Sequence, residues 1–299
     1  MISKKLEVLG LSTLLFAGLV NHSALAAVPA NTGTITIAVA ANFTVTLTTI
    51  TQNFLKAFPL PTYDYHVNLV SDSSGNLLTT IKNNNGVNTY DLFLSADKAR
   101  PDTLVLLPKL AVPTSEWLYA VGELEYWSPV NNVSAGIVYP LKQNTVLANP
   151  ATAPYGTVAA TLLNTISHGV IPFPVPTGTT YNTLPNSVNP FVNVKANITL
   201  TKSAITSTGT IKEGFIHQSS ICSQSGTTKS FTRGGGFHHT YGYNDPTYPH
   251  AKIAQYGIKL VNSARPVGSG SDNLLTNFQN YLNTTAAKNV ITGACYALN

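Results

Sequence analysis

The chain has 299 residues, of which 43% are hydrophobic and 10% are charged. This composition is too apolar for an intrinsically disordered chain, and the length suffices for two lobes of ordinary size. The formal net charge of +5 is scattered, without a run of lysine or arginine. Nucleic-acid-binding proteins gather basic residues on one face or helix, so we predict no nucleic-acid partner.

Residues 1–26 have the pattern of a secretory signal peptide. Lys4 and Lys5 form a charged start, residues 9–20 are an apolar core, and the segment ends in an Ala-Leu-Ala cleavage pattern. The apolar core is too short to span a membrane. We expect cleavage after Ala26 and export of the mature protein to the periplasm or beyond.

Three strand–turn–helix units follow one another along the chain. Residues 34–40, 65–70 and 90–94 have the apolar patterns of strands, and each run ends in small polar residues before a helical pattern. Alternating units of this kind predict an α/β fold with a mostly parallel sheet. Ligands of such sheets bind beyond the carboxyl ends of the strands, so we expect the three turns to converge.

The turn at residues 71–76 reads Ser-Asp-Ser-Ser-Gly-Asn and joins a strand to a helix. The first amides of a helix have no intrahelical partner and carry the positive end of the helix dipole. Such a turn predicts an anion site. The alternative is an ordinary N-cap, because Ser and Asn cap helices in many proteins.

The second half of the chain is less regular. A strand-like run covers 118–127, and a short strand at 146–148 precedes a Gly/Pro-rich turn and a helix over 158–166. Proline-rich and glycine-rich compositions predict irregular insertions at 169–193 and 219–249. Further predicted elements are a short helix from 196, strands at 213–218 and 254–261, a helix at 274–282 and a last short helix before Cys295.

The chain contains two cysteines, Cys222 and Cys295. An even number in an exported protein indicates a disulfide, and two cysteines allow one connectivity. The bond would tie the C-terminus to a loop in the middle of the chain. The alternative is two buried thiols.

Four motifs occur in order: AVAANF at 38–43, SSG at 73–75, YDLFLSAD at 90–97 and ANPATAPYG at 148–156. Together they resemble the periplasmic molybdate-binding proteins of ABC importers. The resemblance implies a class II periplasmic-binding-protein fold, in which two α/β lobes are joined by two crossing strands with a ligand cleft between them. The implied division is lobe 1 at 27–119 plus 258–299 and lobe 2 at 120–257.

The resemblance also implies a ligand site made of neutral hydrogen-bond donors. By position, the implied ligand-binding residues are Asn42, Ser74, Ala96, Tyr155, Ile198 and His217. Asn42 stands where a serine is commoner, but an amide donates as a hydroxyl does. His217 stands where many members carry a tyrosine, and a protonated imidazole would add a charge and a pH dependence.

The implied function is capture of molybdate, and of tungstate, for an ABC permease. The protein would act as a monomer that closes around the anion, without a cofactor and without a chemical reaction. We find no hydrolase, zinc-protease, nucleotide-binding or dithiol motif, so no enzyme is predicted. One alternative is the same fold binding sulfate, phosphate or a small organic anion, with a cavity lined by His217 or Arg233 as its sign. Another is a surface interaction or assembly protein that retains the fold.

His238, His239 and His250 lie close in sequence to Asp245, and histidine and carboxylate side chains are metal ligands. Their spacing matches no established metal motif. The alternative is a surface loop rich in tyrosine and histidine.

Overall fold

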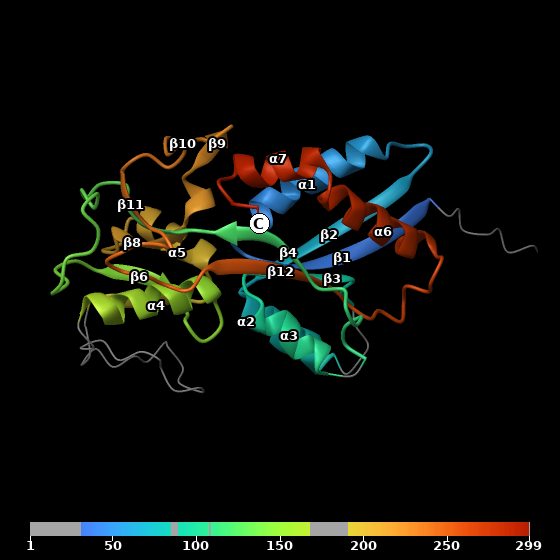
Figure 1. Cartoon of the computed structure of the whole chain (residues 1–299), viewed down its shortest axis with the longest axis horizontal. Helices are drawn as coiled ribbons and strands as arrows, with labels where there is room; N and C mark the ends of the chain where they lie inside the picture. Colours follow the sequence, from blue (N-terminus) through green and yellow to red (C-terminus); the bar gives the residue numbers. More distant parts are fainter. Residues whose placement is uncertain (1–30, 85–88, 108, 168–190, 299) are drawn as a thin grey trace, which may run out of the picture.

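The computed structural model describes residues 31–84, 89–107, 109–167 and 191–298. These residues form two α/β lobes that lie side by side, joined by segments that cross between them (Figure 1). The predicted fold class is confirmed. The predicted signal peptide and most of the predicted insertion at 169–193 lie outside the described residues. Within these ranges, no helix has the length and apolar character needed to cross a membrane.

Lobe 1 is built on a five-stranded sheet with the order β2-β1-β3-β12-β4. Its strands are β1 (Thr32–Ala40), β2 (Asp64–Asp72), β3 (Leu92–Ser95), β4 (Trp117–Gly122) and β12 (Ile253–Lys259). β1 pairs in parallel with β2 and β3, whereas β12 is antiparallel to β3 and β4. The carboxyl ends of β1, β2 and β3 therefore share one edge of the sheet, as the sequence predicts.

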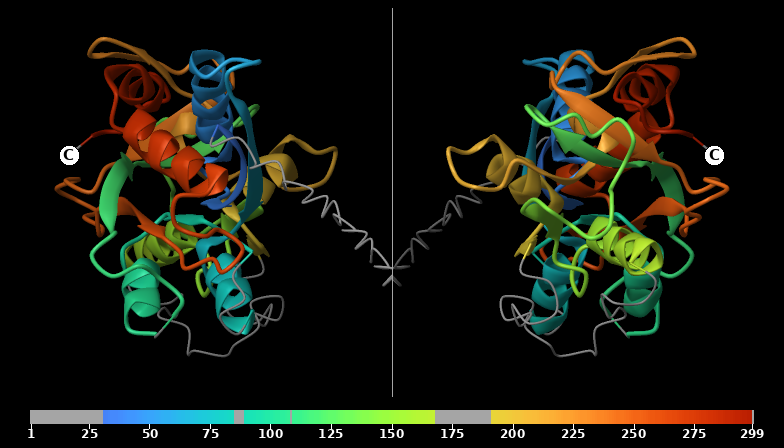
Figure 2. Two further views of the ribbon diagram at one scale, coloured as in Figure 1. Left: turned by 90° about the vertical axis from the view of Figure 1, so that its right-hand side faces the viewer. Right: turned by 90° about the vertical axis from the view of Figure 1, so that its left-hand side faces the viewer.

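Helices cover both faces of this sheet (Figures 1 and 2). One face carries α1 (Thr44–Ala57), α6 (Gly270–Leu282) and α7 (Thr285–Gly293), and the other carries α2 (Ser74–Asn83) and α3 (Ala99–Val105). β1 serves both cores, because Ile37 and Val39 pack toward α1 while Ala38 packs toward α2. A strand buried on both faces needs a continuous apolar run, which residues 37–40 of β1 provide.

Lobe 2 has its own five-stranded sheet with the order β11-β5-β8-β6-β7. Its strands are β5 (Leu124–Ser128), β6 (Thr145–Ala148), β7 (Val192–Lys195), β8 (Glu213–His217) and β11 (Phe237–Tyr241), and its helices are α4 (Pro154–Ile166), α5 (Ile198–Thr206) and the 3₁₀ helix η2 (Gln218–Ser220). The predicted strand-like run at 118–127 is two strands in two sheets. The chain changes lobes at Glu123, between β4 and β5.

The segment 219–249 is more regular than its composition predicts. It contains β9 (Ser223–Ser225) and β10 (Thr228–Ser230), which pair antiparallel, and β11 at the edge of the lobe 2 sheet. Three-residue strands are too short to show a period of two, so the glycine-rich composition dominates the pattern.

The predicted disulfide is present. Cys222 follows η2 in lobe 2, and Cys295 follows α7 in lobe 1. The bond therefore links the two lobes, as well as two distant parts of the chain.

Candidate functional site

A small pocket between the lobes brings together five of the six predicted ligand-binding residues. They are Asn42, Ser74, Ala96, Tyr155 and Ile198, whereas His217 does not line this pocket. The remaining space is about 10 Å³, which is room for about one water molecule. Among the described residues, none that lines it is charged.

Three helices start at this pocket, and local chemistry fixes where they start. Ser73 caps α2, because its Oγ accepts a hydrogen bond of 3.3 Å from the amide of Asn76. Asn197 caps α5 in the same way, with Oδ1 accepting from the amide of Leu200 at 3.1 Å. α4 begins with Pro154, whose fixed φ suits the first helical position.

These helix starts leave backbone donors free. Ser74, Tyr155 and Ile198 lie in the first turns of α2, α4 and α5, where an amide has no intrahelical acceptor. No described residue accepts a hydrogen bond from these three amides or from the amide of Asn42. Four unpaired amides thus surround one pocket, three of them at the positive end of a helix dipole.

Ser74 adds a hydroxyl. Its side chain is buried and its Oγ accepts a hydrogen bond of 3.0 Å from the amide of Ala96. The hydroxyl hydrogen of Ser74 therefore stays available for an acceptor in the pocket. The Ala96 amide is already paired in this conformation, so it orients Ser74.

The side chain of Asn42 is fully used inside the protein. Nδ2 donates to Gln255 Oε1 at 2.8 Å and to Tyr296 Oη at 3.1 Å, and the Tyr296 hydroxyl donates to the Asn42 carbonyl at 2.8 Å. Both amide hydrogens of the side chain are taken. What Asn42 can offer a ligand is its backbone amide.

His217 is buried beside Ser219, with 2.6 Å between its Nδ1 and Ser219 Oγ. The single hydroxyl hydrogen of Tyr296 goes to Asn42, so Ser219 donates to Tyr296 at 2.9 Å and accepts from His217 Nδ1. The remaining nitrogen, Nε2, is then an acceptor. Burial, and next the charge of Lys202, lower the pKa of His217 to about 3. The imidazole is therefore neutral near pH 7, and His217 adds no charge there.

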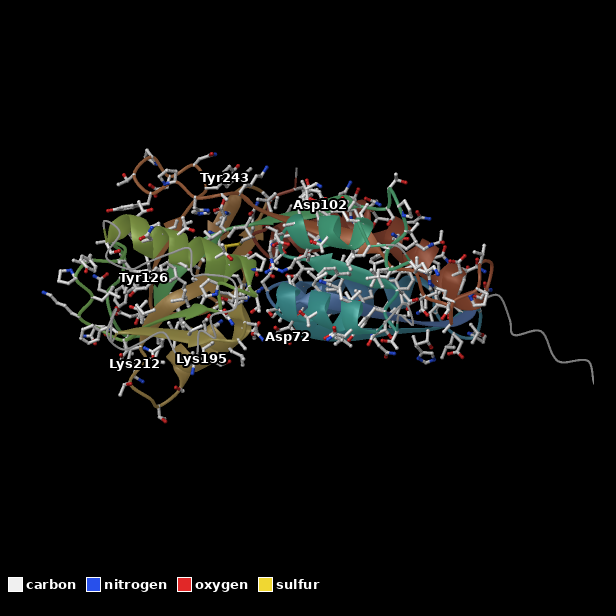
Figure 3. All side chains as sticks on the ribbon, turned by 90° about the horizontal axis from the view of Figure 1, so that it is seen from below. Asp72, Asp102, Tyr126, Lys195, Lys212 and Tyr243 are labelled. Carbon is white, nitrogen blue, oxygen red and sulfur yellow. A yellow bond between two sulfur atoms is a disulfide. The ribbon has the colours of Figure 1, made fainter. Side chains whose placement is uncertain are left out.

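The lobes touch around the pocket. The amide of Gly75 donates to Thr152 O at 2.8 Å, Thr199 Oγ1 donates to Ala41 O at 3.1 Å, and Asn197 Nδ2 donates to Asp72 Oδ1 at 3.4 Å. Figure 3 shows Asp72 at the end of lobe 1 that faces lobe 2. Sequence reasoning missed the role of Asp72, although its place just before the capping Ser73 is a signal for it. These contacts hold the two lobes against each other, so the structure shows the closed state of the cleft.

The three histidines proposed as metal candidates have separate partners. His238 Nδ1 lies 3.1 Å from Glu125 Oε2, His239 Nδ1 lies 2.9 Å from Ser134 O, and His250 Nε2 lies 2.8 Å from Tyr241 O. In the part of the chain that the structure describes, no three histidine, cysteine or acidic side chains are grouped to hold a metal ion.

Comparison with known proteins places these features in a family. A family model described as bacterial extracellular solute-binding protein matches residues 35–296. The molybdate-binding protein ModA of Rhodobacter capsulatus is 35% identical over 136 residues, which are 44% of this chain and 50% of that protein. The chain therefore spans about half the length of this curated relative.

Solved structures share the fold at lower identity. The periplasmic molybdate-binding protein of Azotobacter vinelandii superposes with a TM-score of 0.66 at 23% identity, over 89% of this chain and 99% of that one. The sulfate-binding protein SubI of Mycobacterium tuberculosis has a TM-score of 0.56 at 12% identity, over 88% and 86% of the two chains. At these identities the likeness shows the fold.

Proposed function

The chain belongs to the family of bacterial extracellular solute-binding proteins, and on this premise we propose that it captures molybdate, and tungstate as well, for an ABC importer. The observation that carries the proposal is the pocket with four unpaired backbone amides and the Ser74 hydroxyl. A dianion enclosed by oriented dipoles needs no formal countercharge. The 35% identical relative named as a molybdate-binding protein supports this choice of anion.

In this proposal the donors are the Ser74 hydroxyl and the backbone amides of Asn42, Ser74, Tyr155 and Ile198. The side chain of Asn42 and the amide of Ala96 position them. The closed pocket has room for about one water molecule, so the lobes must separate slightly to admit a tetrahedral oxyanion. Discrimination against sulfate, which is smaller, then depends on how far the lobes close.

Because the anion accepts hydrogen bonds from both lobes, it stabilises the closed state. We place the hinge at the lobe crossings, at Glu123 and ahead of Ile253, close to the predicted lobe boundaries at 119/120 and 257/258. The closed protein would deliver its cargo to a membrane permease as a monomer, with no chemistry on the anion. Export through the predicted signal peptide at residues 1–26 belongs to the same proposal.

The test is thermal unfolding of the mature protein with molybdate, tungstate, sulfate, phosphate or no anion. A ligand that binds only the folded state adds about 2.7 kcal/mol at a hundredfold excess over Kd. We expect a rise in Tm with molybdate and tungstate alone, and a smaller rise for Ser74→Ala. Ser71→Ala is the matched control, because Ser71 Oγ is exposed and contacts Thr44 instead of the pocket. An unchanged Tm with every oxyanion would overturn the proposal.

A further inference from the structure

A second pocket lies between the lobes, beside the oxyanion pocket. Its volume is about 360 Å³, within the range of about 300–1,000 Å³ that small-molecule sites occupy. Lobe 1 contributes the start of α1, and lobe 2 contributes α5 and the residues around His217. The part of the lining that the argument uses is Val45, Thr46, Lys202, His217 and Arg233.

A hydrogen bond divides the two pockets. Ala41 lines both of them, whereas Ile198 lines the oxyanion pocket and Thr199 lines the second pocket. Thr199 Oγ1 donates to Ala41 O across the lobes at 3.1 Å. The second pocket therefore adjoins the oxyanion pocket across this hydrogen bond and is the larger of the two, with volumes of about 360 and 10 Å³.

The second pocket is positively charged, in contrast to its neutral neighbour. It contains Lys202 and Arg233, and none of its lining residues is acidic. Arg233 is exposed and forms no hydrogen bond or ion pair with any residue that the structure describes. Lys202 Nζ donates to Ser220 O at 2.6 Å, which leaves two of its three hydrogens, and it also lies 5.7 Å from the centroid of the Trp127 ring. Two cations without a carboxylate favour an anionic occupant.

The pKa of Lys202 is consistent with a pocket that contains two cations. Burial lowers the pKa of Lys202, and the nearby charge of Arg233 lowers it further. A bound carboxylate would relieve that repulsion, because opposite charge favours the protonated ammonium.

His217 gives the pocket a hydrogen-bond acceptor. Its Nδ1 is committed to Ser219, so Nε2 carries a lone pair and has no partner among the described residues. Because a lone pair repels an anionic oxygen, a suitable ligand presents a hydroxyl hydrogen to Nε2. The side chain of Val45 and the methyl group of Thr46 offer a carbon surface for the body of the ligand.

We propose that the second pocket binds a small organic hydroxycarboxylate, with its carboxylate at Lys202 and Arg233 and its hydroxyl at His217 Nε2. The proposal goes beyond oxyanion capture and uses different residues, so it does not depend on molybdate. Since Val45 and Lys202 come from different lobes, an occupant also favours the closed state. Hydroxycarboxylate binding should then tighten oxyanion binding, and the reverse.

Isothermal titration with L-malate and succinate tests the proposal, because the two dicarboxylates differ by one hydroxyl. We expect malate to bind the wild-type protein and succinate to bind about tenfold more weakly, the size of one hydrogen bond to a buried acceptor. Arg233→Gln should raise the Kd of malate about tenfold, and its exposed position makes misfolding a minor concern. Lys142→Gln is the matched control, an exposed cation of lobe 2 outside the second pocket.

Three results would overturn the proposal: no heat with malate, equal affinity for malate and succinate, or an equal loss in Lys142→Gln and Arg233→Gln. Loss of malate binding in Ser74→Ala but not in Arg233→Gln would also overturn it, because malate would then occupy the oxyanion pocket. The proposed function fails separately. If the protein does not bind molybdate but binds malate, and Arg233→Gln weakens that malate binding, the proposed function fails and the hydroxycarboxylate site is still supported.

Discussion

Gly75 allows the first turn of α2 to approach lobe 2 closely. A Cβ at this position would lie 2.8 Å from Thr152 Cα and 2.9 Å from Thr152 O, both backbone atoms that cannot swing aside. We predict that Gly75→Ala raises the Kd for molybdate about tenfold, since overpacking of this kind costs about 1–3 kcal/mol. Titration calorimetry measures the effect. The unliganded protein should keep its stability, because separating the lobes relieves the clash.

Gly293→Ala is the control for this prediction. Gly293 is also helical, but a Cβ there would meet nothing closer than Gln224 O at 3.8 Å. It should bind molybdate as the wild-type protein does. Equal affinities in Gly75→Ala and the wild type would show that the contact between Gly75 and Thr152 is not part of the bound state.

His217 predicts a specific dependence of stability on pH. Its folded pKa of about 3 lies below the unfolded value of about 6.5. Between these values the unfolded state binds more protons, so the stabilisation is complete above pH 6.5 and falls by about 1.4 kcal/mol per pH unit below it. Denaturant unfolding between pH 7.5 and 5 should show this slope, and His217→Gln should reduce it. The exposed His66→Gln is the control, and identical slopes in all three proteins would contradict the prediction.

The neighbours of Asn42 show what a sequence pattern cannot supply at this scale. The AVAANF motif places Asn42 at the end of a strand and so at the ligand edge of the sheet. Its side-chain partners, Gln255 and Tyr296, are 213 and 254 residues away. No local pattern encodes such distant pairs, so the sequence predicts the position of Asn42 at the end of β1 but not the partners of its side-chain amide.

At the scale of elements, a buried ion network joins the start of β3 to the approach to α6. Asp91 Oδ1 accepts from Arg265 Nε at 2.9 Å, and Asp91 Oδ2 accepts from the Thr36 amide at 2.8 Å. Arg265 Nη1 also donates to Asp272 Oδ1 at 2.8 Å. Asp91 and Arg265 have side chains that are 4% and 5% exposed. Removing Arg265 would leave the buried Asp91 carboxylate without a cation, whereas Arg265 keeps Asp272 as a partner when Asp91 is removed.

We predict that Asp91→Asn lowers the free energy of unfolding by about 1.5–3 kcal/mol, the size of a hydrogen bond to a charged group, because Arg265 keeps its ion pair with Asp272. Denaturant unfolding measures it. Molybdate affinity in the folded variant should stay within about twofold of wild type, because Asp91 does not line the oxyanion pocket. The exposed Asp64→Asn is the control. A loss of affinity with unchanged stability would assign Asp91 to the site instead.

The elements differ in how well the sequence predicts them, for a physical reason. β1, β2 and β3 with their helices follow from apolar periods sustained over several residues. β9 and β10 have three residues each, and their pairing depends on a turn at Gly226, which adopts a φ of +59°. Residues 118–127 form strands in two different sheets because the two lobes pack separately, and the hydrophobic pattern of the sequence carries no information about that packing.

On the scale of the whole molecule, the C-terminus forms a third connection between the lobes. The C-terminal segment is held to lobe 1, because Val121 of β4 and Ala297 exchange two backbone hydrogen bonds of 2.8 and 3.0 Å. Tyr296 accepts from Ser219 of lobe 2, and Cys295 is bonded to Cys222. Figure 1 shows the C-terminus at the junction of the lobes. A hinge with this extra link should open less than one with two crossing strands alone.

The disulfide therefore predicts a limit on opening. Cys222→Ser with Cys295→Ser should lower the free energy of unfolding by about 4 kcal/mol in the chain-entropy model for a separation of 73 residues. The unliganded variant should also have a larger radius of gyration in small-angle X-ray scattering, because its lobes can separate further. Saturating molybdate should bring both proteins to the same radius, since the closed state needs no tether. If the two unliganded proteins scatter identically, the disulfide does not limit the opening of the lobes.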